Sequence, residues 1–169
     1  NFTFQNVKAS SGNPTLSYIY SWPPHMPFIF DANGVVRGGS VATNNIFSDP
    51  DLYRSGYEDS LSFVNSKLFE VVSQIIDSSD VPPIIVLQGD HGPAVLADGD
   101  LSEVSDPSPE LLDERTGILN LMYLPEICSD SPSDELTSVN TFRFVLASCF
   151  GAQLESLPDD VFWGDSDQS

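Results

Sequence analysis

The residues best suited to chemistry in this 169-residue chain are Asp90 and His91, which follow the apolar run IIVL in the string QGDHGP. A carboxylate oxygen beside an imidazole nitrogen suits Zn, Mn or Mg, whereas Ca prefers shells made of oxygen alone. Adjacent residues of a regular strand face opposite ways, so both side chains could reach one cation only where the backbone turns. Gly89, Gly92 and Pro93 favour such a turn. An Asp-capped turn beside a solvent-exposed histidine explains the same residues, and the pair alone leaves both interpretations open.

The second histidine, His25, favours the metal interpretation. The chain contains two histidines. Like His91, His25 follows a strand-like run, LSYIY at residues 16–20, and lies at a break rich in proline. Two histidines at the ends of two sheet strands could meet at one edge of the sheet. The alternative for His25 is a partly buried imidazole packed on Trp22 and Phe28.

Alternating helices and strands are expected to position these residues. Apolar residues recur at three- and four-residue steps over residues 57–77, which predicts an amphipathic helix. The continuous β-branched run at residues 84–87 predicts a strand buried on both faces. A second buried strand is expected at 118–124, and a last helix at 139–150 with Gly151 just past its end. A helix that leads into a buried strand through a short loop predicts α/β layering with a largely parallel sheet.

Three segments are predicted as loops or tails. Residues 35–56 are rich in Gly, Ser, Asn and Asp, and we expect a surface loop there. Residues 93–114 are acidic and contain three prolines, so they either border a site or form a disordered insertion. Residues 164–169 are polar and are expected to fray.

The last predicted helix carries one of the two cysteines on its apolar face. The positions expected to face inward are Phe142, Val145, Leu146, Cys149 and Phe150. The other cysteine, Cys128, follows a strand-like run. Two buried free thiols are favoured at these positions, and a single bridge between them is the alternative.

The composition is that of one globular domain, or part of one, with a strongly acidic balance of charge. The chain has 25 acidic and 6 basic residues, and its formal net charge is -19. It offers no cationic surface to meet phosphates, which argues against nucleic acid and anionic membrane surfaces as partners. No stretch approaches the roughly 20 apolar residues that span a bilayer. We therefore expect a soluble segment that makes no membrane contact of its own.

Several strings along the chain together resemble the C-terminal half of sulfatase-like proteins of the alkaline phosphatase superfamily. In chain order they are PPHMPFIFDANG, GYEDSLSFVNSKL, PPIIVLQGDHGP, RTGILNLMYLPE, SVNTFRFVLASCFG and LESLPDDVFW. The string GDHG at residues 89–92 is the most specific, and the His-x-Pro-Phe pattern at residues 25–28 is the next. The resemblance implies a layered α/β/α fold with a mainly parallel central sheet, as in alkaline phosphatase. Residues 1–169 would then be the C-terminal part of a single catalytic domain.

The same resemblance implies roles for individual residues. It makes Asp90 and His91 ligands of one catalytic divalent metal ion, which could be Mn, Mg, Ca or Zn. It makes His25 a contact of the substrate's sulfuryl or phosphoryl oxygens or of the leaving group. Arg115 and Asn140 lie in matching strings without a role to carry over, and we interpret them as structural. The parent protein would hydrolyse or transfer sulfate or phosphate esters, outside the cytoplasm or at a membrane.

The chain also departs from this family. Such enzymes have an earlier half that supplies the nucleophile, a Thr, Ser or modified Cys, and a further acidic ligand, and nothing before His25 matches that half. Two-metal relatives need a histidine after the Asp-His pair, and none follows His91 here. We therefore expect a single-metal site, no activity from this chain alone, and the missing N-terminal half as its partner. The alternative is a non-catalytic, truncated or degenerate module that acts as a binding or structural unit.

Overall fold

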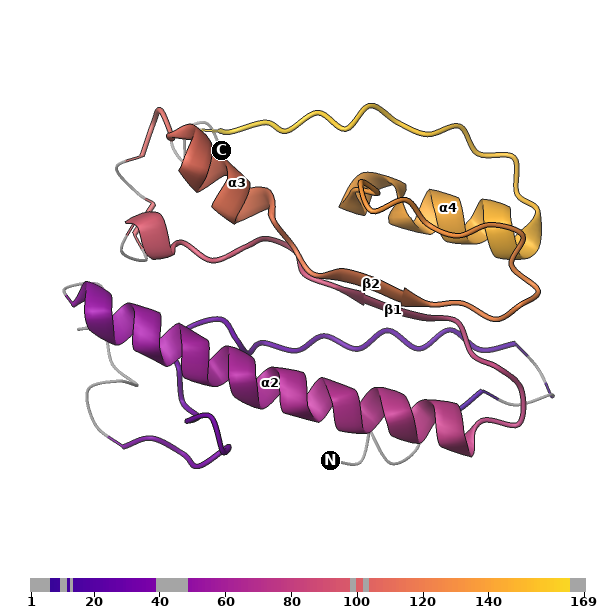
Figure 1. The fold of residues 1–169 in the computed structure, drawn as a ribbon, viewed down its shortest axis with the longest axis horizontal. Helices are drawn as coiled ribbons and strands as arrows, with labels where there is room; N and C mark the ends of the chain where they lie inside the picture. Colours follow the sequence, from indigo (N-terminus) through magenta and orange to yellow (C-terminus); the bar gives the residue numbers. More distant parts are fainter. Residues whose placement is uncertain are drawn as a thin grey trace.

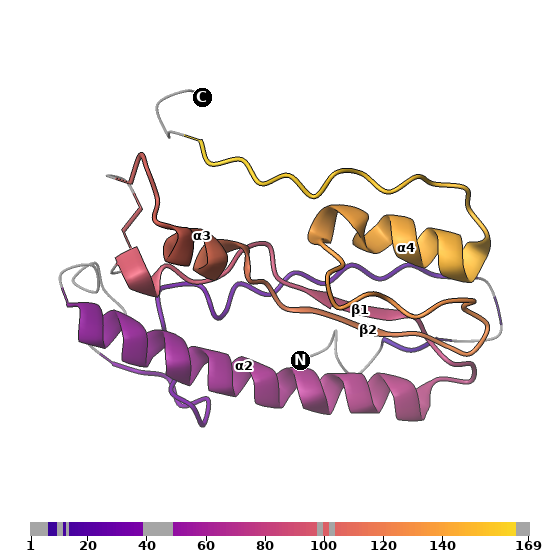
Figure 2. The same cartoon turned by 45° about the horizontal axis from the view of Figure 1, so that its top comes forward.

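A computed structural model describes residues 7–9, 12, 14–38, 49–97, 100–101 and 104–164. In both Figure 1 and Figure 2, a small sheet lies between one long helix and a shorter one. The elements in chain order are α2 (Pro50–Ser78), β1 (Ile85–Gln88), the 3-10 helix η3 (Val95–Ala97), α3 (Pro109–Thr116), β2 (Asn120–Tyr123) and α4 (Ser138–Phe150). Mixed α/β structure is thus confirmed at this coarse level. The expected fraying of 164–169 falls, apart from Gly164, outside the described residues.

Helix α2 begins at Pro50, earlier than its apolar periodicity predicts. Asp49 caps it, because its Oδ1 accepts a hydrogen bond from the Leu52 backbone N–H at 3.1 Å. Pro50 occupies the first turn, where a missing N–H costs nothing. The prediction of a loop over residues 35–56 is therefore wrong from Pro50 onward. The predicted apolar stripe does face inward, with Ile75 buried and the following residues half-buried: Leu61, Val64, Leu68, Val71, Val72 and Ile76.

Strands β1 and β2 pair antiparallel, whereas the sequence predicts a mainly parallel sheet. The register places Ile85 opposite Tyr123 and Gln88 opposite Asn120. The chain leaves the end of β1, passes through η3 and α3, and re-enters the sheet at that same end, which forces the antiparallel direction (Figure 1). Both strands are half-buried instead of enclosed on two faces, and Leu121 on β2 is 57% exposed. No described helix has the length and apolar character that a membrane span requires.

The strand predicted at residues 16–20 is extended but has no strand partner within the described part of the chain. Its side chains lie open to solvent, with Leu16 90% and Tyr18 85% exposed. Sequence propensity indicates an extended backbone, and a ladder additionally needs a neighbouring strand within hydrogen-bonding reach. Residues 16–20 are therefore an extended segment that exposes apolar side chains and pairs with no described strand.

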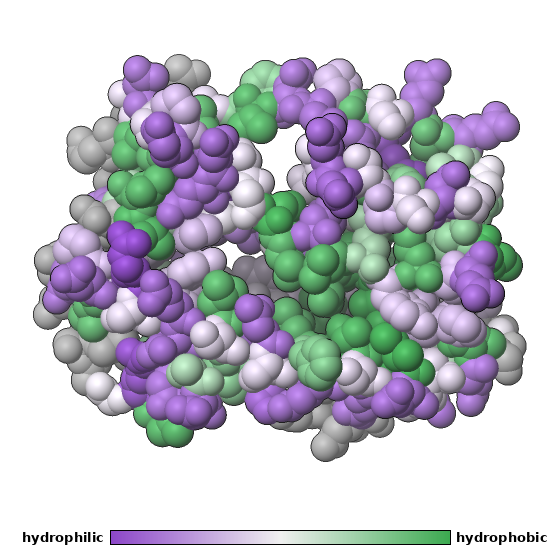
Figure 3. Space-filling model, in the orientation of Figure 1, coloured by the Kyte–Doolittle hydropathy of each residue, from purple (hydrophilic) through white to green (hydrophobic). Residues whose placement is uncertain are grey.

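Helix α4 turns its polar face towards the sheet. Thr141 is fully buried, and its Oγ1 accepts hydrogen bonds from Gln88 Nε2 and Asn120 Nδ2, each at 3.0 Å. Val145 is buried as predicted, and Gly151 ends the helix in the left-handed conformation with φ 69°. The predicted inward stripe is otherwise wrong in direction, because three of its members are exposed, namely Phe142, Leu146 and Phe150. Figure 3 shows apolar groups reaching the surface across the middle of the molecule, between α2 and α4.

Cys128 and Cys149 form a disulfide, so the prediction of two free thiols is wrong. The loop after β2 lies against the last turns of α4. There the Ser129 N–H donates to the Ser148 carbonyl at 3.0 Å, and the Asp130 N–H donates to Ser148 Oγ at 3.1 Å. These contacts bring the two cysteine Cα atoms within 4.1 Å of each other. The apolar pattern identified the face that carries Cys149 but not the loop that covers it.

A small aromatic core joins α2 to the segment that carries His25. Phe28 is 1% exposed, and its ring packs edge-on against Tyr53 and Tyr57, with centroid separations of 5.3 and 6.3 Å. Gly56 makes room for it, because a Cβ at that position would lie 2.4 Å from Phe28 Cδ2. The Phe of the His-x-Pro-Phe pattern is thus an anchor that holds the His25 loop on the first turns of α2.

This core should lose stability in alkali. Burial raises the pKa of Tyr53 and of Tyr57 above the ordinary value of 10.0, although a backbone hydrogen bond with Ala94 acts the other way on Tyr53. The unfolded chain then releases these protons at lower pH than the folded chain, so the stabilisation is complete below about pH 10 and is lost as pH rises above it. We expect the urea midpoint to fall between pH 8.5 and 10.5, and to fall less in a Tyr53→Phe, Tyr57→Phe variant. An exposed control, Tyr18→Phe, should behave like the unmodified chain, and an equal fall in all three would contradict the assignment.

Candidate metal centre

The backbone turns at Asp90 and His91, between two points where it is tied to the returning chain. The Gly89 N–H donates to the Leu119 carbonyl at 2.9 Å, which continues the β1–β2 ladder by one residue. The Gly92 N–H donates to the Arg115 carbonyl at 2.7 Å. Between these ties, Asp90 Oδ1 accepts a hydrogen bond from the His91 N–H at 3.0 Å. The turn that one shared cation would need is therefore present.

The geometry of Asp90 and His91 fits two ligands of one metal ion. His91 Nδ1 lies 2.9 Å from the Gly92 carbonyl oxygen. A carbonyl only accepts, so Nδ1 carries the proton, and Nε2 of the neutral ring keeps a free lone pair. Nε2 lies 3.8 Å from Asp90 Oδ2. Two ligand atoms that each bind one metal at about 2.1 Å can be no more than about 4.2 Å apart, so the pair meets that limit.

His25 reaches the same place from a different part of the chain. Its ring centroid lies 6.3 Å from that of His91, so the two histidines do meet as the sequence suggested. Its Nδ1 donates to the Met26 carbonyl at 2.7 Å, which leaves the lone pair of the neutral ring on Nε2, as in His91. His25 also packs on Trp22 at 4.7 Å between centroids, but it is exposed to solvent and not partly buried.

Neighbouring elements hold the two histidine loops in place. Gln88, the residue before Gly89, is anchored to α4 through Thr141, and Phe28 anchors the other loop to α2. Asp90 also lines a cavity of about 640 Å³ together with Arg115, the first residues of α4 and residues 159–161. That volume is typical of sites for small organic molecules. The carboxylate thus lies where a solvent-exposed turn meets a partly open cavity.

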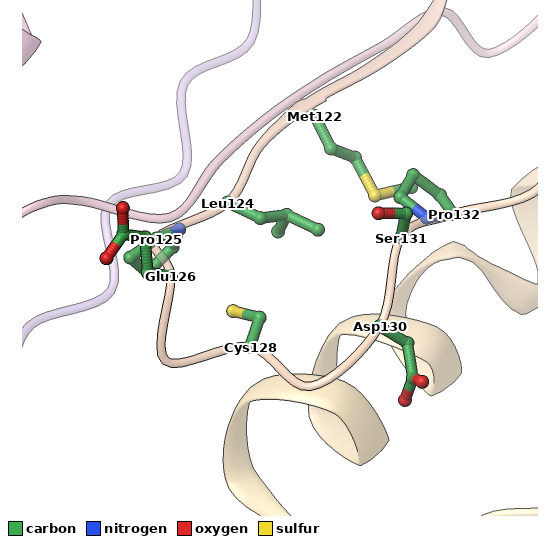
Figure 4. A pocket seen from close by; sticks show the side chains of 8 residues that line it. All are labelled: Met122, Leu124, Pro125, Glu126, Cys128, Asp130, Ser131 and Pro132. Carbon is green, nitrogen blue, oxygen red and sulfur yellow. The ribbon is translucent and has the colours of Figure 1, made fainter.

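A second hollow, of about 260 Å³, lies beneath the loop at residues 124–132. Leu124 and Cys128 point into it, whereas the carboxylates of Glu126 and Asp130 point outward (Figure 4). No histidine lines it. We assign it no chemistry.

The described residues bring two candidate metal ligands together and no larger set. No group of three or more His, Cys, Asp and Glu side chains converges among them. Asn140 is buried and exchanges two hydrogen bonds of 2.9 Å with the Leu157 backbone, in agreement with its structural interpretation. Arg115 is closer to the site than its sequence context suggested, because its Nη1 donates to the Gly92 carbonyl. Its helix comes after a poorly patterned segment, so no sequence signal pointed to this contact.

Comparison with known proteins adds no further assignment, since no family model, no curated protein and no solved structure matches this chain.

Proposed function

We propose that this chain is part of a metal-dependent hydrolase or transferase that acts on sulfate or phosphate esters. In this proposal Asp90 and His91 hold one divalent cation, and His25 contacts the ester. The observation that carries it is the approach of the His25 and His91 ring centroids to 6.3 Å, each ring with Nδ1 bound to a backbone carbonyl and with the lone pair of its neutral form on Nε2. The resemblance of GDHG and His-x-Pro-Phe to sulfatase-like proteins supports the same chemistry.

In this proposal His91 and His25 act in different protonation states. A neutral His91 would offer its Nε2 lone pair and Asp90 a carboxylate oxygen to a divalent cation. Such a cation would offset developing anionic charge and activate a nucleophile. His25 acts with a proton on both ring nitrogens. Because its Nδ1 proton is already donated to Met26, it can donate to an ester oxygen or to the departing oxygen only when Nε2 also carries a proton. The cavity beside Asp90 has room for the organic part of the ester.

We further propose the layered, mainly parallel fold of alkaline phosphatase for the complete domain, with the nucleophile supplied by an N-terminal half. Two observations support this. The extended segment at 16–20 exposes apolar side chains and lacks a strand partner in the described ranges, and α4 exposes Phe142 and Phe150. Additional strands and a covering layer would bury these surfaces. The disulfide suits an oxidising, extracytoplasmic setting.

Removing the metal tests the proposal. The full-length protein should cleave an aryl sulfate or a bis-aryl phosphate, lose that activity on dialysis against a chelator, and regain it with one of Mn, Zn, Mg or Ca. The rate with each ion measured at matched free concentration identifies the metal. Activity that survives complete chelation would contradict the metal assignment.

The competing proposal is a non-catalytic module, and the two-ligand set within the described residues favours it. Two protein ligands rarely hold a divalent cation against water. Absence of cleavage of both ester classes by the metal-loaded, full-length protein would select this alternative. The sequence upstream of Asn1 discriminates as well, since a strand followed by Asp or Glu and by Thr, Ser or Cys at a helix start would favour the enzyme.

A further inference from the structure

The two imidazole rings are held by the same arrangement of hydrogen bonds. Each histidine donates its Nδ1 proton to the carbonyl of the next residue, Met26 after His25 and Gly92 after His91. Each of these carbonyls accepts a second bond from a side chain. Trp22 Nε1 donates to the Met26 oxygen at 2.9 Å, and Arg115 Nη1 donates to the Gly92 oxygen. A carbonyl oxygen has two lone pairs, so it can accept both donors at once.

In each loop the backbone carbonyl selects the tautomer of the histidine that donates to it. The second donor, from Trp22 or Arg115, limits the motion of that carbonyl. A peptide plane in an exposed loop can rotate, and a histidine bound only to such a carbonyl would exchange between its two neutral tautomers. At Gly92 the preceding peptide plane is restrained as well, because the Gly92 N–H donates to the Arg115 carbonyl at 2.7 Å. The Trp22 ring adds a tilted aromatic contact with His25, with 4.7 Å between the ring centroids. Rotating either peptide plane would therefore break more than one contact.

We propose that Arg115 and Trp22 are positioning residues, which keep His91 and His25 in the Nδ1–H tautomer by holding the Gly92 and Met26 carbonyls. Arg115 lies near the C-terminal end of α3, so the placement of that helix decides which nitrogen of His91 is free to bind a cation. Only the use of these nitrogens in catalysis rests on the proposed function. The tautomers themselves are a property of the chain.

Long-range ¹H–¹⁵N correlation spectra of the 169-residue chain test the inference, because its two histidines contribute only four ring nitrogens. At about pH 9, where an ordinary imidazole is neutral, both rings should be mainly Nδ1–H. Arg115→Met should lower the Nδ1–H to Nε2–H ratio of His91 by about fivefold, the size of one neutral hydrogen bond. Trp22→Phe keeps an aromatic ring without the N–H and should lower the ratio of His25 by a similar factor, leaving His91 unchanged.

The chain provides a matched control for each substitution. Arg143→Met removes a guanidinium bond to the Glu155 carbonyl, and Trp163→Phe removes an indole bond to the Val104 carbonyl. Neither control should alter either histidine. Mainly Nε2–H rings in the unmodified chain, unchanged ratios in the two test variants, or equal changes in the controls would overturn the inference.

A conservative variant covers the case in which Arg115→Met fails to fold. Arg115→Lys keeps one cationic donor and should retain the Nδ1–H form of His91, while a folded Lys variant with mainly Nε2–H would contradict the proposal. The outcome is also separable from that of the proposed function. Tautomer ratios that change in the two test variants, in a full-length protein without esterase activity, would support positioning by Arg115 and Trp22 and reject the enzyme.

Discussion

On the proposed function, replacing Asp90 and His91 together by alanine should lower kcat/KM of the full-length protein for an aryl sulfate or a bis-aryl phosphate at least about 100-fold. Loss of a residue that merely orients a metal ligand typically costs 10–100-fold, and here both proposed ligands of this chain are removed. The two side chains lie on one exposed turn, with His91 Nε2 3.8 Å from Asp90 Oδ2, so they would act on a single ion. Initial rates on an aryl sulfate and a bis-aryl phosphate, at saturating metal, measure the loss.

The single variants and a remote carboxylate complete this experiment. Asp90→Ala and His91→Ala should each cost nearly as much as the double variant, because residues that act as a unit are not additive. Asp77→Ala removes an exposed carboxylate near the C-terminal end of α2 and should leave kcat/KM unchanged. Full activity in the double variant would reject both residues as ligands.

Gly92→Ala should damage both the stability of the chain and the geometry of His91. A Cβ on Gly92 would lie 1.8 Å from the carbonyl oxygen of Glu114, which is backbone and cannot rotate away. The turn would have to move off the end of α3, breaking the 2.7 Å bond from Gly92 N to the Arg115 carbonyl. We expect a loss of about 1–3 kcal/mol in the free energy of unfolding, typical of overpacking. Urea denaturation of the chain measures it.

The neighbouring glycine provides the control for this prediction. A Cβ on Gly89 would meet nothing closer than 3.7 Å, an ordinary van der Waals contact. Gly89→Ala should therefore change the free energy of unfolding by less than about 0.5 kcal/mol. Equal losses of unfolding free energy in the two variants would show that the close approach of Gly92 to Glu114 is not the reason why position 92 requires glycine. In the full-length protein, Gly92→Ala should also lower kcat/KM about tenfold or more, since a small displacement of a catalytic group is costly.

The helices were the most predictable part of the fold. The three- and four-residue periodicity located α2, and Gly151 marked the end of α4 because only a left-handed residue closes that helix cheaply. Apolar periodicity does not locate the start of α2, which is marked instead by Asp49 as the capping residue and Pro50 in the first turn. The face of α4 was predicted wrongly because periodicity counts apolar residues, whereas hydrogen bonds at Thr141 decided which side meets the sheet.

The sequence predicted that the two histidines could meet, but not the contacts that hold them. GDHG and His-x-Pro-Phe singled out Asp90, His91 and His25, and the two rings do lie together. Two contacts were not foreseen. Arg115 holds Gly92 across 23 positions of sequence, and the packing of Phe28 depends on the absence of a Cβ at Gly56. Both depend on where a helix lies in space.

The sequence by itself determined which side chains can do chemistry here, the turn that presents Asp90 and His91, and the helical or extended state of most segments. These properties depend on residue types and on neighbours a few positions away, so they are readable along the chain. Only the tertiary structure decided the antiparallel pairing of β1 with β2, the Cys128–Cys149 bridge and the hold of Arg115 on Gly92. Each of these contacts joins segments that are distant in sequence. A pattern of residue types indicates which surfaces need a partner, but it does not indicate which segment provides that partner.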